Sequence, residues 1–222
     1  MEALGQKQHN HYARMMNRYD DLITGRKWWS NLYMKLIWKM NNLQIANEVM
    51  QFIPNNFSGT LLDVPIGTAI FTYQKYKKLK DAEIVGLDYS SEMLRLASIR
   101  AKEQNIKNLK LIEGDVGSMP FEDNSFDLVL CMSGFQVFPD NNKALSEIYR
   151  VMAPEAHFCG CFYVKGERKI ADLFAHYILD RKGLFNPPHW TLQEALTALE
   201  TYFGTNVHYH LNSSILIFDC IK

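Results

Sequence analysis

The most informative stretch of the chain is Leu61-Leu62-Asp63-Val64-Pro65-Ile66-Gly67-Thr68-Ala69, followed later by Gly86-Leu87-Asp88-Tyr89-Ser90. The pattern predicts a buried strand, a tight loop that opens a helix, and a second strand that ends in an acid. In a doubly wound sheet such a loop approaches a nucleoside with its backbone, and such an acid accepts hydrogen bonds from the ribose hydroxyls. The two stretches therefore predict a nucleoside-binding α/β fold.

From residue 60 onward, short apolar runs alternate with amphipathic segments. The apolar runs lie at 60–64, 83–87, 109–112, 126–132 and 157–163, and the helical segments between them at 68–79, 91–104 and 140–152. This alternation is typical of βαβ units and a mostly parallel sheet. Further on we expect a helix over about 168–182, another from Thr191, and two terminal strands, at about 205–210 and 214–221, that form an antiparallel hairpin.

The length of 222 residues favours one domain with an appendage. Residues 1–58 are predicted to form an N-terminal helical lid or cap, with a break near Thr24-Gly25. Residues 59–222 are predicted to form a Rossmann-like domain that carries a helical insertion at about 167–200. The fold class is therefore α/β, with the lid as a separate layer.

Charge and composition exclude some classes of function. Lys plus Arg and Asp plus Glu both total 24, which argues against a nucleic-acid-binding surface. The four cysteines lack metal-ligand spacing, so we expect buried thiols and no metal. The first residues lack an apolar signal core, and charged and amide side chains interrupt the longest apolar stretch. We therefore expect no membrane span and a cytoplasmic protein.

Asp63-x-Pro65-x-Gly67-x-Ala69 resembles motif I of the class I S-adenosylmethionine-dependent methyltransferases, whose pattern is acid-x-Gly-x-Gly-x-Gly. The stretch from Pro120 to Val129 closely resembles the family's approach to its fourth strand, in which Asp127 is expected to bond loop amides. The end of the next helix is also similar, although Glu155 and Ala156 replace the family's glycines. The resemblance covers about residues 58–165 and implies a doubly wound, seven-stranded, mostly parallel sheet with an antiparallel terminal strand.

The resemblance also implies the cofactor, S-adenosylmethionine, with S-adenosylhomocysteine as the product. Asp88 would hold the ribose, while Asp115 and Val116 would hold the adenine. The expected cofactor-binding residues are Asp63, Pro65, Gly67, Thr68, Asp88, Tyr89, Met93, Asp115, Val116 and Met132. Methyl transfer is an in-line substitution, so the protein would act mainly by aligning the reactants in a dry pocket.

The acceptor is expected to be a small, partly apolar molecule, such as a phenol or a quinone-like ring. Aromatic and methionine side chains in the N-terminal segment and near strand ends would line its pocket. The expected substrate-binding residues are Tyr12, Tyr19, Tyr33, Phe135, Gln136 and Tyr163. No motif designates a base; the candidate catalytic residues are Gln136, which could only orient the acceptor, and His11 and His189. We expect a monomer or a homodimer.

Three other functions fit parts of the sequence. A dinucleotide dehydrogenase shares the fold but needs Gly-x-Gly-x-x-Gly, where this chain has Pro65, Gly67 and Ile70. An enzyme with the same cofactor pocket could catalyse a different reaction, such as a cyclisation. The degenerate motif I would also suit a non-catalytic partner subunit, since fold alone does not decide function.

Overall fold

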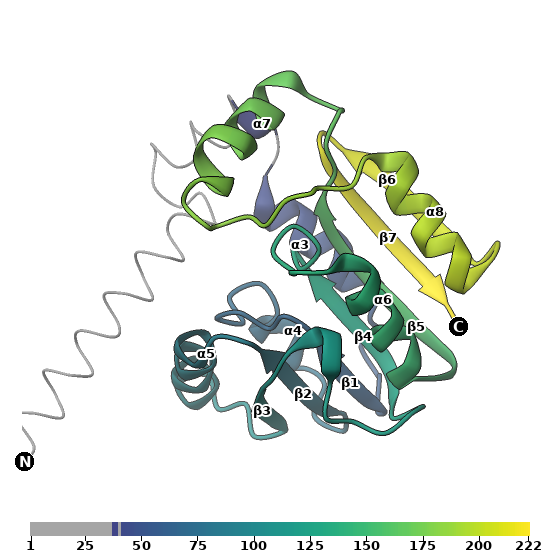
Figure 1. Ribbon diagram of the computed structural model, residues 1–222. Helices are drawn as coiled ribbons and strands as arrows, with labels where there is room; N and C mark the ends of the chain where they lie inside the picture. The colour runs from purple at the N-terminus through teal and green to yellow at the C-terminus, as the bar shows by residue number, and fades with distance from the viewer. Residues whose placement is uncertain (1–36, 40) are drawn as a thin grey trace, which may run out of the picture.

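A seven-stranded sheet forms the centre of the molecule (Figure 1), seen in a computed structural model that describes residues 37–39 and 41–222. The strands lie in the order β3-β2-β1-β4-β5-β7-β6. They are β1 (Thr60–Asp63), β2 (Glu83–Asp88), β3 (Leu109–Glu113), β4 (Phe126–Met132), β5 (Met152–Tyr163), β6 (Val207–Asn212) and β7 (Ile215–Ile221). Neighbours among β1–β5 are parallel, and β7 runs antiparallel to both β5 and β6. The predicted fold class and terminal hairpin are confirmed.

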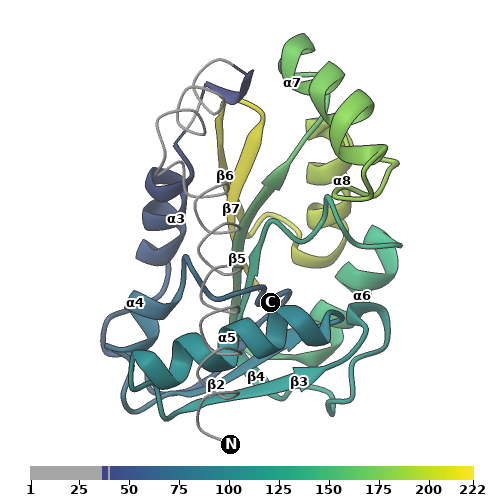
Figure 2. The same cartoon turned by 90° about the vertical axis from the view of Figure 1, so that its left-hand side faces the viewer.

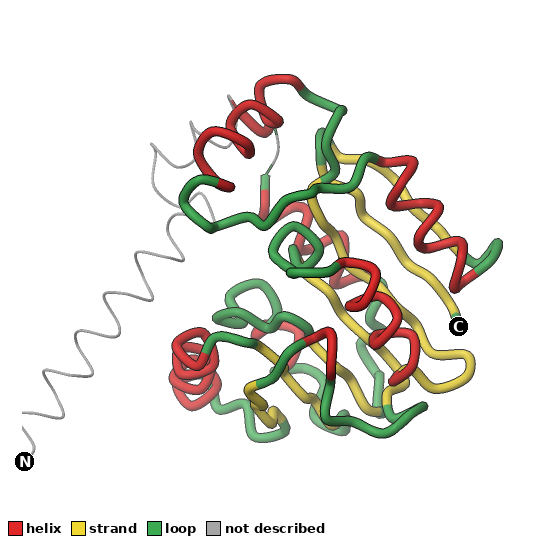
Figure 3. Tube along the Cα trace, viewed as in Figure 1, coloured by secondary structure: helices red, strands yellow, loops and turns green. Residues whose placement is uncertain are grey.

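Helices cover both faces of the sheet (Figure 2). One face packs against α3 (Asn42–Gln51), α4 (Tyr73–Tyr76) and α5 (Ser91–Glu103), and the other against α6 (Asn141–Val151) and α8 (Leu192–Phe203). Two hydrophobic cores result, one on each side of the strands. The insertion, α7 (Lys169–Phe174) and the π-helical segment η3 (Ala175–Asp180), lies beyond the carboxyl end of β5 (Figure 3).

Side-chain caps explain where three of these helices begin. The Ser90 hydroxyl accepts a hydrogen bond from the Met93 amide, and Asp140 accepts one from the Lys143 amide. Thr191 and Glu194 form a reciprocal capping box at the start of α8. Each cap satisfies an amide that the first helical turn leaves without a backbone partner. These boundaries agree with the expected starts near residues 91, 140 and 191.

The first crossover differs from the prediction of a helix over 68–79. Only the four residues of α4 are helical, preceded by a series of turns. Gly67 and Ala69 adopt φ values of 55° and 56°, in the left-handed region that an α-helix does not contain. The chain therefore turns twice after β1 before a helix can begin, and the apolar spacing of this segment reflects packing of the turns.

The strand β5 begins at Met152, five residues before the predicted start. The helix α6 ends at Val151 and passes directly into the strand. Glu155 adopts a φ of 62°, a conformation that a glycine would reach at lower cost. The strand β5 nevertheless includes both Glu155 and Ala156, the residues that replace the family's glycines.

The residues around the start of β4 have a structural role. The Asp127 carboxylate accepts hydrogen bonds from the backbone amide and the hydroxyl of Thr60, at 2.8 and 2.9 Å. The Arg150 guanidinium binds Asp123 and Glu147 and also donates to the Phe121 carbonyl. Asp127 thus bonds an amide as predicted, although that amide belongs to β1. Together these contacts connect the loop before β4 to β1 and α6.

Part of the predicted lid lies outside the described residues, including the predicted break near Thr24-Gly25. Within the described part of this segment, Asn42–Gln51 form the helix α3, which Asn41 caps. In the described part of the chain, no helix is both long enough and apolar enough to cross a bilayer. All four cysteines are buried free thiols, and the described residues contain no group of potential metal ligands.

We predict that Gly160→Ala strongly destabilises the sheet. A Cβ at this position would lie 2.0 Å from the carbonyl oxygen of Cys131 and 2.8 Å from its carbonyl carbon. Because both are backbone atoms of the neighbouring strand, β4 and β5 would have to separate, lowering the free energy of unfolding by roughly 3 kcal/mol. Urea denaturation measures the effect. The control is Gly114→Ala, whose Cβ would meet the Leu87 side chain at 3.2 Å; equal stability of the two variants would contradict the prediction.

Candidate functional site

The expected cofactor residues come together along one edge of the sheet. The strands β3, β2, β1 and β4 are parallel neighbours, so their carboxyl ends lie at the same edge. Asp63 ends β1, Asp88 ends β2, Asp115 follows β3 and Met132 ends β4. The strand order changes direction between β1 and β4, and doubly wound sheets bind ligands at such a switch point.

Hydrogen bonds from both flanking strands fix the loop after β1. The Val64 amide donates to the Leu130 carbonyl of β4, and the Ile66 amide donates to the Leu87 carbonyl of β2. Pro65, which has no amide hydrogen, is half-buried between them. Beyond these anchors the backbone turns at Gly67. Apart from Gly67 and its two chain neighbours, no atom of the described residues lies within 4 Å of the place where a Cβ would be. A ligand can therefore approach the backbone directly at this glycine.

Asp88 connects this loop to the end of β2. One carboxylate oxygen accepts from the Gly67 amide at 2.8 Å, and the other accepts from the Ser90 amide at 2.9 Å. The side chain is largely buried, and burial raises its pKa. Each carboxylate oxygen can accept more than one hydrogen bond, so Asp88 retains capacity for ligand hydroxyls. The adjacent Tyr89 is 81% exposed.

Arg100 also holds the loop, although it was not among the residues expected at the site. Its guanidinium donates to the backbone carbonyl of Thr68 and lies 5.8 Å from the centre of the Tyr73 ring. Both Arg100 and Thr68 are buried. The sequence contained one signal for this contact, since Arg100 follows Ala97 by three residues and so lies on the apolar face of α5. An arginine is almost never fully buried unless it is paired, so a partner could have been expected there.

Asp63 is a buried carboxylate with one hydrogen bond. The hydroxyl of Tyr76 in α4 donates to Oδ2 at 2.6 Å, while the buried Oδ1 has no partner in the part of the chain that the structure describes. Burial raises the pKa of Asp63 to about 7, and the hydrogen bond from Tyr76 opposes that shift. Tyr76 was not expected at the site either, since a tyrosine in a helical pattern is usually a core residue.

The remaining cofactor candidates lie around the same edge. Asp115 is exposed, and one of its oxygens accepts from the Gly117 amide at 2.8 Å, capping the short helix η2 (Val116–Ser118). Val116 is buried beneath it. Met93 and Met132 are half-buried, in the first turn of α5 and at the end of β4. The structure thus brings all ten expected cofactor residues to the ends of four adjacent strands.

Two of the residues expected to bind the methyl acceptor, Phe135 and Gln136, are buried in the protein. Phe135 is 1% exposed and stacks on Trp190 in the core beneath α6 and α8. The side-chain oxygen of Gln136 accepts from the Tyr163 amide at 3.2 Å, and its backbone carbonyl accepts from the Asn186 amide. Both residues therefore join the loop after β4 to neighbouring segments.

Tyr163 and His189 belong to a cluster of aromatic rings at the end of β5. The ring of Tyr163 lies 5.6 Å from that of Trp38, 5.7 Å from that of Phe185 and 5.4 Å from the imidazole of His189. Trp38 comes from a segment far from the other three rings in the sequence, so local spacing could not show that it contacts them. The other four candidates, His11, Tyr12, Tyr19 and Tyr33, lie outside the described residues.

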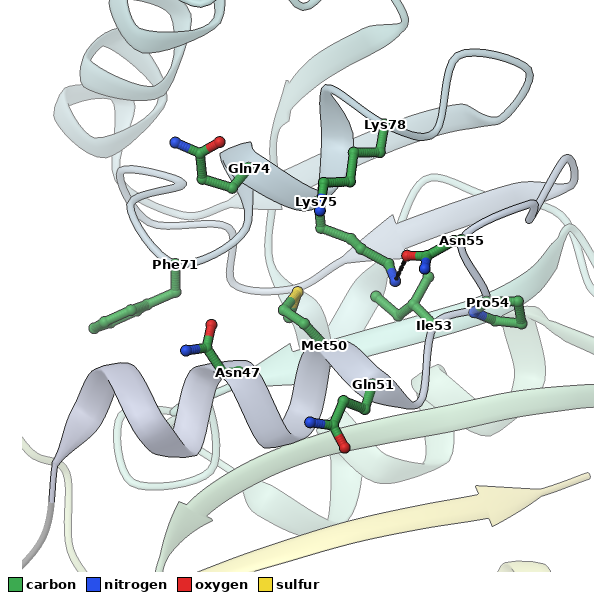
Figure 4. Close-up of a pocket in the computed structure, with 10 residues that line it drawn as sticks. All are labelled: Asn47, Met50, Gln51, Ile53, Pro54, Asn55, Phe71, Gln74, Lys75 and Lys78. Atoms are coloured by element: carbon green, nitrogen blue, oxygen red, sulfur yellow. Dashed lines mark hydrogen bonds between the residues drawn. The ribbon is translucent and has the colours of Figure 1, made fainter.

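A separate groove of about 330 Å³ lies between α3 and α4 (Figure 4). The Lys75 ammonium donates to the Asn55 side chain across it at 2.9 Å. Its lining contains none of the predicted site residues and consists of Asn47, Met50, Gln51, Ile53, Pro54, Asn55, Phe71, Gln74, Lys75 and Lys78.

We predict that Asp63→Asn stabilises the protein increasingly as the pH rises from about 4 to 7. The unfolded carboxyl ionises near the ordinary aspartate pKa of 3.8 while the folded one keeps its proton up to about 7, so wild-type stability falls across this window and levels off above it. Asparagine does not ionise, so its burial carries no pH-dependent cost, and its side-chain oxygen can still accept the hydrogen bond from Tyr76. Between pH 5 and 8 the variant should gain about 1–3 kcal/mol over wild type, measured by urea unfolding. The same gain in the exposed Asp81→Asn variant would refute the assignment to Asp63.

Comparison with known proteins agrees with the observed fold. A family profile described as "Methyltransferase domain" matches residues 57–195. The chain is similar to a demethylmenaquinone methyltransferase of Listeria welshimeri, with 29% identity over 144 residues, or 62% of this chain and 61% of that protein. The aligned part thus spans less than two thirds of that relative.

Solved structures share the fold at low sequence identity. A SAM-dependent methyltransferase from Aquifex aeolicus has a TM-score of 0.60 at 17% identity, covering 79% of this chain and 88% of that one. The [4+2]-cyclase SpnF has a TM-score of 0.61 at 18% identity, covering 78% and 59%. With a family profile matched over more than half of its length, the chain belongs to the class I S-adenosylmethionine-dependent methyltransferases.

Proposed function

We propose that this protein binds S-adenosylmethionine and transfers its methyl group to a small, partly apolar acceptor. One observation carries the proposal: the ends of β3, β2, β1 and β4 bring a carboxylate, an open glycine loop and a capped Asp-Val turn to one edge. When bound there, S-adenosylmethionine supplies an electrophilic methyl group on a positively charged sulfur.

The residues present fit that group. The open space at Gly67 allows a ligand to approach the loop, and the buried Oδ1 of Asp63 is an acceptor without a protein partner at the start of the same loop. Asp88 would accept hydrogen bonds from the ribose hydroxyls, and Tyr89 would cover the nucleoside. Asp115 and Val116 would bind the adenine. Pro65, Thr68, Met93 and Met132 would complete the pocket.

The acceptor would bind at the β4–β5 side of the same edge. Tyr163 ends β5, and the aromatic cluster around it offers flat apolar surfaces suited to a ring. The segment 1–58 would act as a lid. We further propose that the protein works in the cytoplasm as a monomer or homodimer, without nucleic acid. Its free thiols suit a reducing compartment.

A second reaction class has one supporting observation, the likeness in fold to a [4+2]-cyclase. Product analysis separates the two: methyl transfer yields a methylated product and S-adenosylhomocysteine in equal amounts, whereas a cyclisation yields neither. A partner subunit would bind no cofactor and would form a stable complex.

Calorimetric titration with S-adenosylhomocysteine tests the cofactor assignment, with NAD as the control ligand. We expect one-to-one binding that NAD does not reproduce. A folded protein that binds neither ligand would contradict the proposed function and favour the partner-subunit alternative.

We predict that Asp88→Ala weakens S-adenosylhomocysteine binding more than tenfold. The variant loses charge-assisted hydrogen bonds to the ribose, each worth roughly 1.5–3 kcal/mol, and also loses the acceptor that holds the Gly67 amide. Calorimetry of Asp81→Ala, an exposed aspartate in the turn before β2, is the matched control. Unchanged affinity in Asp88→Ala would disprove the ribose assignment.

A further inference from the structure

His189 and Asp180 form a buried pair inside the insertion. The imidazole Nε2 lies 2.9 Å from Oδ1 of Asp180, and His189 is 8% exposed. A carboxylate can only accept a hydrogen bond, so Nε2 carries the proton of the neutral ring. The lone pair is then on Nδ1, the nitrogen that can take up a proton.

Nδ1 of His189 is buried and has no hydrogen-bond partner among residues 37–39 and 41–222. Burying a polar atom without a partner costs free energy, and most buried polar side-chain atoms in proteins are satisfied. The remaining capacity of this ring therefore suits a group that the described residues do not supply.

The surroundings of the imidazole suit an aromatic ligand. The rings of Tyr163 and Phe185 lie 5.4 and 5.6 Å from it, both edge to face. Trp38 contacts those same two rings from the far end of the described chain. A planar ring with one polar group would suit aromatic neighbours of this kind better than a flexible polar substrate would.

The pair also lies on the side of the sheet where the acceptor is expected. Tyr163, which touches His189, comes two residues after Cys161, the strand partner of Met132 at the end of β4. The side chain of Gln136 bonds the Tyr163 amide, so the loop after β4 is directly connected to this corner.

We propose that His189, oriented by Asp180, accepts the proton of a phenolic hydroxyl as that oxygen is methylated. The inference rests on the proposed function and names the class of its acceptor. The phenolic O–H bond breaks and its proton moves to Nδ1, while the oxygen bonds the methyl carbon. The sulfur–methyl bond breaks, its electron pair stays on sulfur, and the sulfonium becomes a neutral thioether. The imidazolium later releases the proton to water.

Charged and titratable groups next to the His189–Asp180 pair affect how readily the imidazole takes up a proton. From η3, Asp180 stabilises the imidazolium, and Nδ1 of His176 lies 3.7 Å from its second oxygen. From β5, the Tyr163 hydroxyl donates to Asp172 of α7 at 2.6 Å, so that carboxylate is engaged with the tyrosine. Asp180 is thus the carboxylate that contacts the imidazole in the described part of the chain.

The test compares wild type with His189→Gln, Asp180→Asn and the control His208→Gln, an exposed histidine on β6. Each protein is titrated with S-adenosylhomocysteine and then assayed for methylation of 1-naphthol, catechol and the more acidic 4-nitrophenol across the pH range. We expect His189→Gln to retain cofactor affinity and to lose about 100-fold or more in kcat near pH 7. The loss should shrink at high pH and for 4-nitrophenol, because an ionised phenol needs no base. Asp180→Asn should show a smaller loss, and His208→Gln none.

A readout independent of turnover is nitrogen-15 NMR of the histidine rings in the complex with S-adenosylhomocysteine. We expect the Nε2–H tautomer at His189 in wild type and a changed pattern in Asp180→Asn.

Three outcomes would overturn the inference while leaving cofactor binding intact. They are an equal loss at every pH and for every phenol, methylation only at ring carbon, and a wild type that methylates none of the phenols. Failure to bind S-adenosylhomocysteine would instead count against the proposed function.

Discussion

The hydrogen bond from the Gly67 amide to the Asp88 carboxylate joins the two stretches on which the site depends. Together with the bond from the Ile66 amide to the Leu87 carbonyl, it connects the loop after β1 to the end of β2. The bond needs a residue at position 67 that tolerates a φ of 55°, which a glycine does without strain. The backbone hydrogen bonds from Val64 to Leu130 and from Ile66 to Leu87 hold the start of the loop against the two neighbouring strands.

Three ionisable side chains are buried around this hydrogen bond, which costs folding free energy. Asp63, Asp88 and Arg100 are each less than a tenth exposed, although residues of these types are almost never fully buried unless paired. Arg100 is bonded to the Thr68 carbonyl and Asp88 to two amides, whereas Asp63 keeps one oxygen without a partner. Concentrated burial of polar groups at one sheet edge is characteristic of a binding site, because packing alone would favour apolar residues there.

The two halves of the edge differ in whether their residues belong to a recognisable sequence motif. Residues 57–195 match the methyltransferase profile, and within them the β1–β4 half contains the resemblance to motif I. The β5 half takes its character from Trp38, Phe185, Asp180 and His189, which come from segments outside any motif. This division fits the proposal that one half of the edge binds the cofactor and the other half binds the acceptor.

Sequence alone determined the sheet and the cofactor edge. Apolar runs separated by capped amphipathic helices allow few arrangements, since parallel crossovers are right-handed and strand ends share an edge. Asp63, Gly67, Asp88 and Asp115 could thus be placed at that edge from the sequence, and their expected roles toward the cofactor followed from the family resemblance. The tertiary structure decided the rest: the turns at Gly67 and Ala69, the contacts of Arg100 and Tyr76 with the loop, and the interior positions of Phe135 and Gln136. It also decided the pairing of His189 with Asp180, because such contacts depend on which surfaces meet after packing, and local periodicity contains no record of them.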